Sequence, residues 1–251
     1  MKMIRLIHSC FSSKCGHLPL MECCREHRRT TAEKYARPCL LGVFFMVTVL
    51  GFKPAYSAEI PTNHSRFEAV KIKKGTERAA AYFDGKSTKA VVFVPGAIFN
   101  KESWFFLAKR LQQLNIASLS LDGKGEEEVL SAVRFLKEKG FTQVVLVGAS
   151  MGGAAVLHAL DEKTDSRIEK VIVLAPAGGA PIKSRRINKL FVIARNDRLG
   201  IYQRVKKTYI ESANPKEFVE YEGSEHAQHL FKGVHKEELS KLLISFIGAR
   251  Q

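Results

Sequence analysis

Short apolar runs alternate with amphipathic segments through most of the chain, and this alternation constrains the fold more than any other feature. Almost continuous apolar runs, typical of strands buried on both faces, lie at 89–96, 142–148, 168–176 and 187–194. Segments with apolar residues at helical spacing lie between or before these runs, at 101–114, 126–140 and 151–160. Strands that alternate with helices predict an α/β fold, with a mostly parallel sheet flanked by helices.

Further strands and one more helix complete the predicted domain. Residues 67–72 and 78–83 are strand candidates joined by a glycine-containing stretch, as in a hairpin. Residues 116–122 and 217–223 are two more strands, and 236–248 forms an amphipathic closing helix. No repeat or low-complexity linker interrupts 59–251, so we expect this part to be one domain.

The strand at 142–148 ends in the motif G-x-S-x-G, which is Gly148-Ala149-Ser150-Met151-Gly152. Ligands of parallel α/β sheets bind at the carboxyl ends of the strands, where this serine lies. A serine nucleophile needs a sharp, strained turn, and glycines on either side let the strand and the helix pass closely. The alternative is that Ser150 is only a small turn residue.

On this motif, placed between a buried strand and a helix, the chain resembles the α/β-hydrolase family. The resemblance implies the order nucleophile, acid and histidine along the chain. Asp197 follows the strand at 187–194, whereas the preceding strand ends without an acid. His226 comes three residues after Gly223, similar to the Gly-x-x-His form of the family, and His229 is the alternative.

The resemblance also implies an oxyanion hole made by two backbone amides. One is the amide of Met151, and the other is that of Ala97 in the loop after the strand at 89–96. Many relatives have His-Gly in that loop, where this chain has Pro95-Gly96. The segment at 175–186 is too short for a lid domain, so the chain looks most similar to compact, lidless, dienelactone-hydrolase-like enzymes and esterases.

The function that this resemblance implies is a serine hydrolase that cleaves carboxylic esters or thioesters through an acyl-enzyme. Ser150 would be the nucleophile, His226 the general base and Asp197 the residue that orients the imidazole. The alternatives are a peptidase or amidase on the same fold and a catalytically inactive binding protein. We expect no cofactor and no metal, and a small-molecule or lipid-like ester as substrate.

Some residues near the predicted strand ends have two readings. Asp197 could instead cap a helix at 198–209, and Asp122 could cap the helix that begins near Glu126. His158 is expected to be structural. Several large apolar residues could line an acyl pocket or belong to the core: Phe99, Trp104, Phe105, Leu199, Ile201 and Tyr202.

The formal net charge is +15, but the basic residues are spread along the chain. A solvated basic surface explains this better than a nucleic-acid site, and we expect no nucleic acid as partner. Around the strand ends we expect positive charge from residues 183–186, Lys189, Arg195, Arg198 and Arg204. A solvated face is the favoured explanation of this cluster, and attraction of anionic substrates or of an anionic surface is the alternative.

The first 58 residues are typical of a targeting segment, either cleaved or disordered. A basic stretch precedes thirteen uncharged residues at 40–52, which are too few to cross a bilayer as a helix, since that takes about 20. Small residues follow, so we expect a secretory signal cleaved after Ser57 or Ala58, with a start at Met21 as one reading. An uncleaved anchor and a buried helix are the alternatives. All five cysteines precede residue 40, so the predicted domain has no disulfide.

Overall fold

The structure is a computed structural model and describes residues 66–72, 79–160 and 165–249. The expected targeting segment, its apolar run and the five cysteines lie outside these residues. Among the residues that are described, no helix is long and apolar enough to span a membrane.

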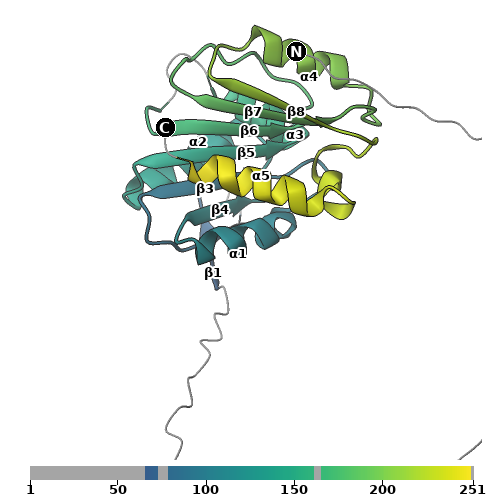
Figure 1. Cartoon of the computed structure of the whole chain (residues 1–251). Helices are drawn as coiled ribbons and strands as arrows, with labels where there is room; N and C mark the ends of the chain where they lie inside the picture. Colours follow the sequence, from purple (N-terminus) through teal and green to yellow (C-terminus); the bar gives the residue numbers. More distant parts are fainter. Residues whose placement is uncertain (1–65, 73–78, 161–164, 250–251) are drawn as a thin grey trace, which may run out of the picture. The chain divides into compact units, whose positions relative to one another are not determined.

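The described residues form one eight-stranded sheet with the order β1-β2-β4-β3-β5-β6-β7-β8 (Figure 1). From β4 to β8 all neighbouring strands are parallel, and β2 runs antiparallel to both β1 and β4. The predicted α/β class with a mostly parallel sheet is therefore confirmed. The strands are β1 Phe67–Lys71, β2 Ala79–Phe83, β3 Lys89–Val94, β4 Ala117–Leu121, β5 Gln143–Ala149, β6 Ile168–Leu174, β7 Asn188–Ala194 and β8 Lys216–Tyr221.

Helices cover both faces of the sheet. In Figure 1, α1 and α5 lie in front of the sheet, and α2 and α3 lie behind it. The rings of Tyr209 in α4 and Phe191 in β7 pack 5.7 Å apart, which holds α4 on the sheet. The helices are η1 Lys101–Trp104, α1 Phe105–Gln113, α2 Glu126–Glu138, α3 Met151–His158, α4 Tyr202–Glu211, η2 Ala227–Lys232 and α5 Lys236–Gly248, where η marks a 3-10 helix.

The core is built from the apolar runs seen in the sequence. Every residue of β3 is buried, as are all residues of β5 after Gln143. Because both faces of these central strands are covered by helices, neither face needs polar side chains. Trp104 is fully buried and stacks on Phe93 with ring centroids 5.1 Å apart.

Two buried lysines, Lys89 and Lys170, interrupt this apolar pattern at the amino ends of β3 and β6. Lys89 of β3 donates to the carbonyl of Ile247 at 3.0 Å and pairs with Glu169 at 2.8 Å. Lys170 of β6 donates to the carbonyl of Phe246 at 2.7 Å. Both cations thus lie at the carboxyl end of α5, where unpaired carbonyls and the helix dipole favour positive charge.

The element boundaries differ from the predicted ones for identifiable reasons. The predicted helix at 101–114 divides into η1 and α1. The predicted strand at 168–176 stops at Leu174, because Ala175 has a φ of 41° and leaves the extended conformation. Asp122 does not cap α2, because the N-cap of this helix is Gly125. The carboxylate of Asp122 accepts instead from the amide of Lys101 at 3.0 Å.

Candidate active site

Ser150 lies on a sharp turn between β5 and α3. Its backbone has φ 50° and ψ −114°, an unfavourable conformation for a residue with a Cβ atom. The two glycines of the motif permit the turn. A Cβ atom on Gly148 would lie 2.5 Å from the carbonyl oxygen of Gly152, and one on Gly152 would lie 2.4 Å from that of Val94. The motif therefore forms the tight strand-to-helix turn that its sequence predicts.

The structure brings Ser150, His226 and Asp197 into one chain of hydrogen bonds. The Nε2 atom of His226 lies 2.7 Å from the Oγ atom of Ser150, and its Nδ1 atom lies 2.8 Å from Oδ2 of Asp197. Asp197 and His226 are buried, with 4% and 6% of their surface exposed. The three side chains are thus in direct contact although they are far apart in the sequence.

The protonation of this chain follows from its donors and acceptors. The ionised carboxylate of Asp197 can only accept, so Nδ1 of His226 carries the proton and donates it. Nε2 of the neutral ring is then an acceptor for the hydroxyl proton of Ser150. This arrangement lets the imidazole remove the hydroxyl proton while the carboxylate stabilises the resulting imidazolium.

Backbone hydrogen bonds between two loops place Asp197 beside His226. The amides of Arg195, Asn196 and Arg198 after β7 donate to the last carbonyl of β8 and to two carbonyls of the chain after it, at 2.8, 3.0 and 3.1 Å. The second carboxylate oxygen of Asp197 accepts from the amide of Leu199 at 2.9 Å. Asp197 is not the cap of a helix at 198–209: the observed helix α4 has Ile201 as its N-cap.

The two backbone amides expected in the oxyanion hole lie at the same edge of the sheet. Met151 is the first residue of α3, and the first amides of a helix have no partner within it. Ala97 follows β3 and lines the same pocket as Ser150. Ala97 thus borders the same pocket as Ser150, and Met151 follows Ser150 directly in the chain.

Gln228 is a site residue that the sequence did not reveal. Its Oε1 accepts from the amide of Gly96 at 2.7 Å, and its Nε2 donates to the hydroxyl of Ser103 at 2.7 Å. It is buried, with 3% of its surface exposed. Gln228 thereby ties the loop that carries Ala97 to the loop that carries His226. No local pattern marks it, since its partners lie more than 120 residues away.

A pocket of about 220 Å³ opens beside Ser150 and His226. Its apolar walls include Ile98, Phe99 and Leu199. Only Phe99 and Leu199 among the expected pocket residues line it. Trp104 and Ile201 are buried in the core, and Phe105 and Tyr202 pack against it.

His229 lies in the wall of this pocket but outside the hydrogen-bonded chain. Its amide donates to the carbonyl of His226 at 3.0 Å, and its ring packs against Phe99 at 5.1 Å between centroids. Burial lowers the pKa of His229, and the positive charges of Arg198 and Lys232 lower it further. The geometry therefore favours His226 over His229 as the partner of Ser150. His158 is exposed at the end of α3, away from the chain of hydrogen bonds.

The basic residues expected around the strand ends divide between the two ends of the sheet. Lys189 lies at the amino end of β7, buried, and donates to the carbonyls of Ser184 and Ile187 at 2.6 and 2.7 Å. Residues 183–186 lie at that end too, so their expected place near the ligand site was wrong. Arg195 and Arg198 follow β7 and do lie at the carboxyl end, whereas Arg204 is an exposed residue of α4.

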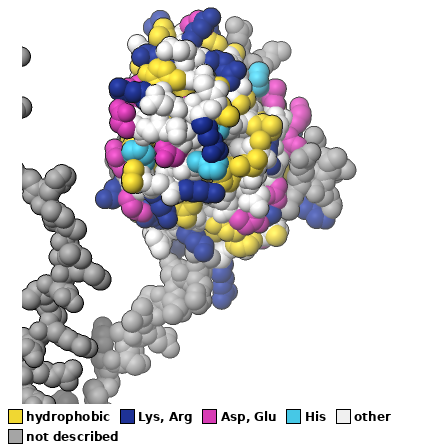
Figure 2. All heavy atoms as spheres, turned by 90° about the vertical axis from the view of Figure 1, so that its right-hand side faces the viewer, with side chains coloured by type: hydrophobic (Ala, Val, Ile, Leu, Met, Phe, Trp, Pro, Cys, Tyr) yellow, Lys and Arg dark blue, Asp and Glu magenta, His cyan; other side chains and the backbone are white. Residues whose placement is uncertain are grey.

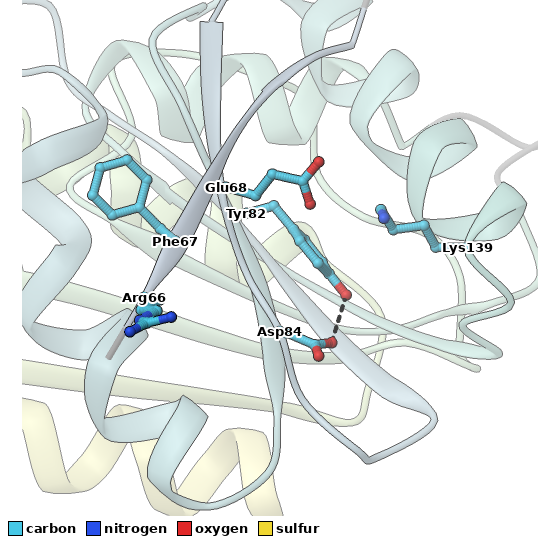
Figure 3. Close-up of a pocket in the computed structure, with 6 residues that line it drawn as sticks. All are labelled: Arg66, Phe67, Glu68, Tyr82, Asp84 and Lys139. Atoms are coloured by element: carbon cyan, nitrogen blue, oxygen red, sulfur yellow. Dashed lines mark hydrogen bonds between the residues drawn. The ribbon is translucent and has the colours of Figure 1, made fainter. Parts of the chain in front are cut away.

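A second pocket lies at the β1–β2 edge of the sheet (Figure 3). The hydroxyl of Tyr82 donates to Asp84 at 3.0 Å, and the ammonium of Lys139 lies 4.6 Å from the centre of the Tyr82 ring. Burial is the main cause that raises the pKa of Tyr82, and the hydrogen bond to Asp84 raises it further. This second pocket is lined by Arg66, Phe67, Glu68, Tyr82, Asp84 and Lys139.

Within the described part of the chain, no cluster of His, Cys, Asp and Glu could hold a metal ion.

Comparison with known families gives one match. The model of the alpha/beta hydrolase family matches residues 91–234, which include Ser150, Asp197 and His226. A comparison with curated proteins finds no sequence match.

Solved structures of this fold resemble the chain at low sequence identity. An esterase from Exiguobacterium antarcticum is 13% identical with a TM-score of 0.59, covering 72% of this chain and 100% of its own. A dienelactone hydrolase from Anabaena variabilis is 18% identical with a TM-score of 0.57, covering 71% and 94%. A monoacylglycerol lipase from Paleococcus ferrophilus is 14% identical with a TM-score of 0.58, covering 68% and 98%. At such low identities, the likeness shows that the fold is shared and nothing more.

Proposed function

Because this chain belongs to the alpha/beta hydrolase family, and because Ser150, His226 and Asp197 form one hydrogen-bonded chain, we propose that it is a serine hydrolase. Its substrates are carboxylic esters or thioesters, cleaved through an acyl-enzyme. The observation that carries this proposal is the 2.7 Å contact between the hydroxyl of Ser150 and the imidazole of His226. The similar folds of an esterase and a monoacylglycerol lipase support the ester as the bond that is cleaved.

The proposed reaction has two halves. The Oγ atom of Ser150 attacks the carbonyl carbon while Nε2 of His226 takes the hydroxyl proton, and the amides of Ala97 and Met151 stabilise the oxyanion. Collapse of the tetrahedral intermediate breaks the bond to the leaving alcohol or thiol, which receives the proton from His226. A water molecule, deprotonated by His226, then attacks the acyl-enzyme and releases the acid and the free hydroxyl of Ser150.

The size and lining of the pocket support a short acyl group. A space of about 220 Å³ with Ile98, Phe99 and Leu199 in its walls suits a small apolar chain. The segment between β6 and β7 contains no helix, so no lid domain covers the site from there. These features favour small esters over long-chain substrates.

A fluorophosphonate probe tests the proposed nucleophile, because this probe reacts with activated serines. We expect the purified protein to be labelled and the Ser150→Ala variant to lose all labelling. Ser245→Ala is the matched control, since Ser245 is an exposed residue of α5, and it should be labelled like the wild type. Undiminished labelling of Ser150→Ala would exclude Ser150 as the nucleophile. A panel of esters and matching amides then separates an esterase from an amidase.

A further inference from the structure

A further hollow, of about 340 Å³ and distinct from the pocket at the β1–β2 edge, adjoins the active-site pocket at the carboxyl end of the sheet. Arg198 and His229 line both spaces. The other residues of this hollow, which we call the basic groove, are Ser224, Glu225, Lys232 and Gly233. A ligand whose carbonyl group lies at Ser150 can therefore extend into the basic groove without leaving the surface.

Phe99 and His229 form the wall between the apolar pocket and the basic groove. The Nζ atom of Lys232 lies 5.2 Å from the centre of the Phe99 ring, which in turn packs on His229. Figure 2 views the molecule from this side and shows Lys, Arg and His side chains interspersed with hydrophobic ones. An apolar space thus adjoins a cationic one at the packed rings of Phe99 and His229.

The two cations of the basic groove have no carboxylate partner among the described residues. Arg198 and Lys232 are both exposed, and neither forms an ion pair with an acid in the described ranges. Arg195, three residues before Arg198, behaves differently: it pairs with Glu220 at 2.5 Å and with Glu222 at 3.4 Å. Pairing is thus readily available at this edge of the sheet, and Arg198 does not take part in it.

Glu225 is the one acid in the lining of the basic groove, and it forms no ion pair with Arg198 or Lys232. Its carboxylate lies close to Gly223, where a Cβ atom would be 2.3 Å from Oε2. Arg198 and Lys232 both act electrostatically on His229: burial is the main cause that lowers the pKa of His229, and these two positive charges lower it further. Two independent cations therefore act on the same wall of the substrate site.

We propose that the natural substrate is an ester or thioester that also carries an anionic group, a carboxylate or a phosphate, bound by Arg198 and Lys232 in the basic groove. This proposal rests on the proposed hydrolase function and adds a substrate class to it. A planar guanidinium binds either anion through two parallel hydrogen bonds, and the ammonium of Lys232 adds a point charge. The short apolar part of the substrate occupies the pocket beside Phe99.

Two pairs of esters test the proposal, with the charge on either side of the scissile bond. The first pair is 3-carboxyphenyl butyrate and its neutral analogue 3-carbamoylphenyl butyrate. The second is the mono-4-nitrophenyl ester of glutaric acid and 4-nitrophenyl 4-carbamoylbutyrate. In at least one pair we expect kcat/KM for the anionic ester to exceed that of the neutral one about tenfold, the factor that one charge-assisted hydrogen bond typically contributes.

Charge-removing variants locate the source of this preference. Arg198→Gln and Lys232→Gln should each reduce the anionic-to-neutral ratio of kcat/KM, and the double variant should bring it to about one. Arg204→Gln removes the same charge from α4, outside the groove, and should keep the ratio of the wild type. The preference should also weaken as salt is added, because the two cations are exposed.

The outcomes separate this proposal from the hydrolase function. Ser150-dependent hydrolysis without an anionic preference in either pair would overturn the substrate class and leave the hydrolase intact. Absence of Ser150-dependent hydrolysis of any ester would overturn both. If the preference appears in the first pair, calorimetry on Ser150→Ala gives a readout without turnover, in which 3-hydroxybenzoate should bind and 3-hydroxybenzamide should bind at least about tenfold more weakly. If the variants instead abolish binding to phosphatidylglycerol vesicles and keep the ester preference, the groove binds lipid headgroups and the proposal is wrong.

Discussion

His226 and His229 are three residues apart, and only their surroundings distinguish them. His226 has the carboxylate of Asp197 on one ring nitrogen and the hydroxyl of Ser150 on the other. His229 packs on an aromatic ring, and its Nε2 atom has no hydrogen-bond partner among the described residues. A general base needs a group that gives up a proton to it and a group that orients its ring, and of these two histidines His226 has both.

Replacing each histidine in turn tests this difference. We expect His226→Ala to lower kcat for an activated ester by at least about 10³-fold, because the hydroxyl loses its proton acceptor. His229→Ala should lower it by less than about tenfold, through pocket shape alone. Steady-state kinetics on both variants measure the difference, and a larger loss in His229→Ala would reverse the assignment.

Lys189 is a residue whose burial should appear in the pH dependence of stability. Burial lowers the pKa of its ammonium to about 8, with a smaller contribution from Lys216. Between this value and the unfolded value near 10.4, the unfolded chain binds the proton and the folded one does not. The free energy of unfolding should therefore rise with pH in this window, by at most about 1.4 kcal/mol per pH unit.

Urea unfolding at pH 8 to 10 measures this contribution by comparison of variants. Relative to the wild type, Lys189→Met should show a smaller rise of unfolding free energy across that range. Lys86→Met, at an exposed loop position, should keep the slope of the wild type. Equal slopes for wild type and Lys189→Met would mean that Lys189 titrates as it does in water.

At the scale of elements, the turn between β5 and α3 depends on how closely three segments approach. A Cβ atom on Gly152 would lie 2.4 Å from the carbonyl oxygen of Val94 and 2.5 Å from that of Pro95. Both are backbone atoms, so a whole strand end would have to shift to make room. The glycine thus allows α3 to pass beside the end of β3, and with it brings Ser150 near Ala97.

Gly152→Ala should therefore destabilise the fold, by about 1–3 kcal/mol, as overpacking does. It should also reduce labelling by a serine probe, since the turn that presents Ser150 moves. Gly248→Ala is the control: nothing lies within 4 Å of the added Cβ atom, and alanine favours the helix, so stability should stay equal or rise. Thermal unfolding of both variants tests this, and an unchanged Tm for Gly152→Ala would contradict the close packing.

Much of this element-level arrangement could be predicted from the sequence. The apolar runs predicted β3, β5, β6 and β7, and the glycines predicted the turn at Ser150, because both are local patterns with a direct physical cause. Gln228 could not be found in this way. It acts through Gly96 and Ser103, and a residue type has no local signature for contacts that form only when distant loops meet.

At the scale of the whole molecule, the cations that we have described differ in burial between the two ends of the sheet. At the amino ends, Lys89, Lys170 and Lys189 are buried against backbone carbonyls. At the carboxyl ends, Arg198 and Lys232 stay exposed beside the site. The net charge of +15 therefore does not describe one basic surface, and only a small part of it lies beside the candidate site.

Export is the whole-chain prediction that the sequence makes. When the full chain is produced in a host that recognises its signal, we expect the exported protein to begin at Ala58 or Glu59. Phe45→Arg places a charge in the apolar run and should keep residues 1–58 attached and the protein inside the cell. N-terminal sequencing of both proteins measures this, and an exported protein that retains 40–52 would refute cleavage.

The sequence by itself determined the fold class and the turn at Ser150, because both depend on local patterns of apolar residues and glycine, whereas Asp197 and His226 were expected from the resemblance to the α/β-hydrolase family. The tertiary structure decided which residues surround that site. Trp104 and Ile201 lie in the core, and Lys189 lies at the amino end of the sheet, opposite the site. Arg198 and Lys232 line one groove beside the site. The reason is physical: packing and long-range hydrogen bonds act between residues that are distant along the chain, and their partners exist only once the sheet has formed.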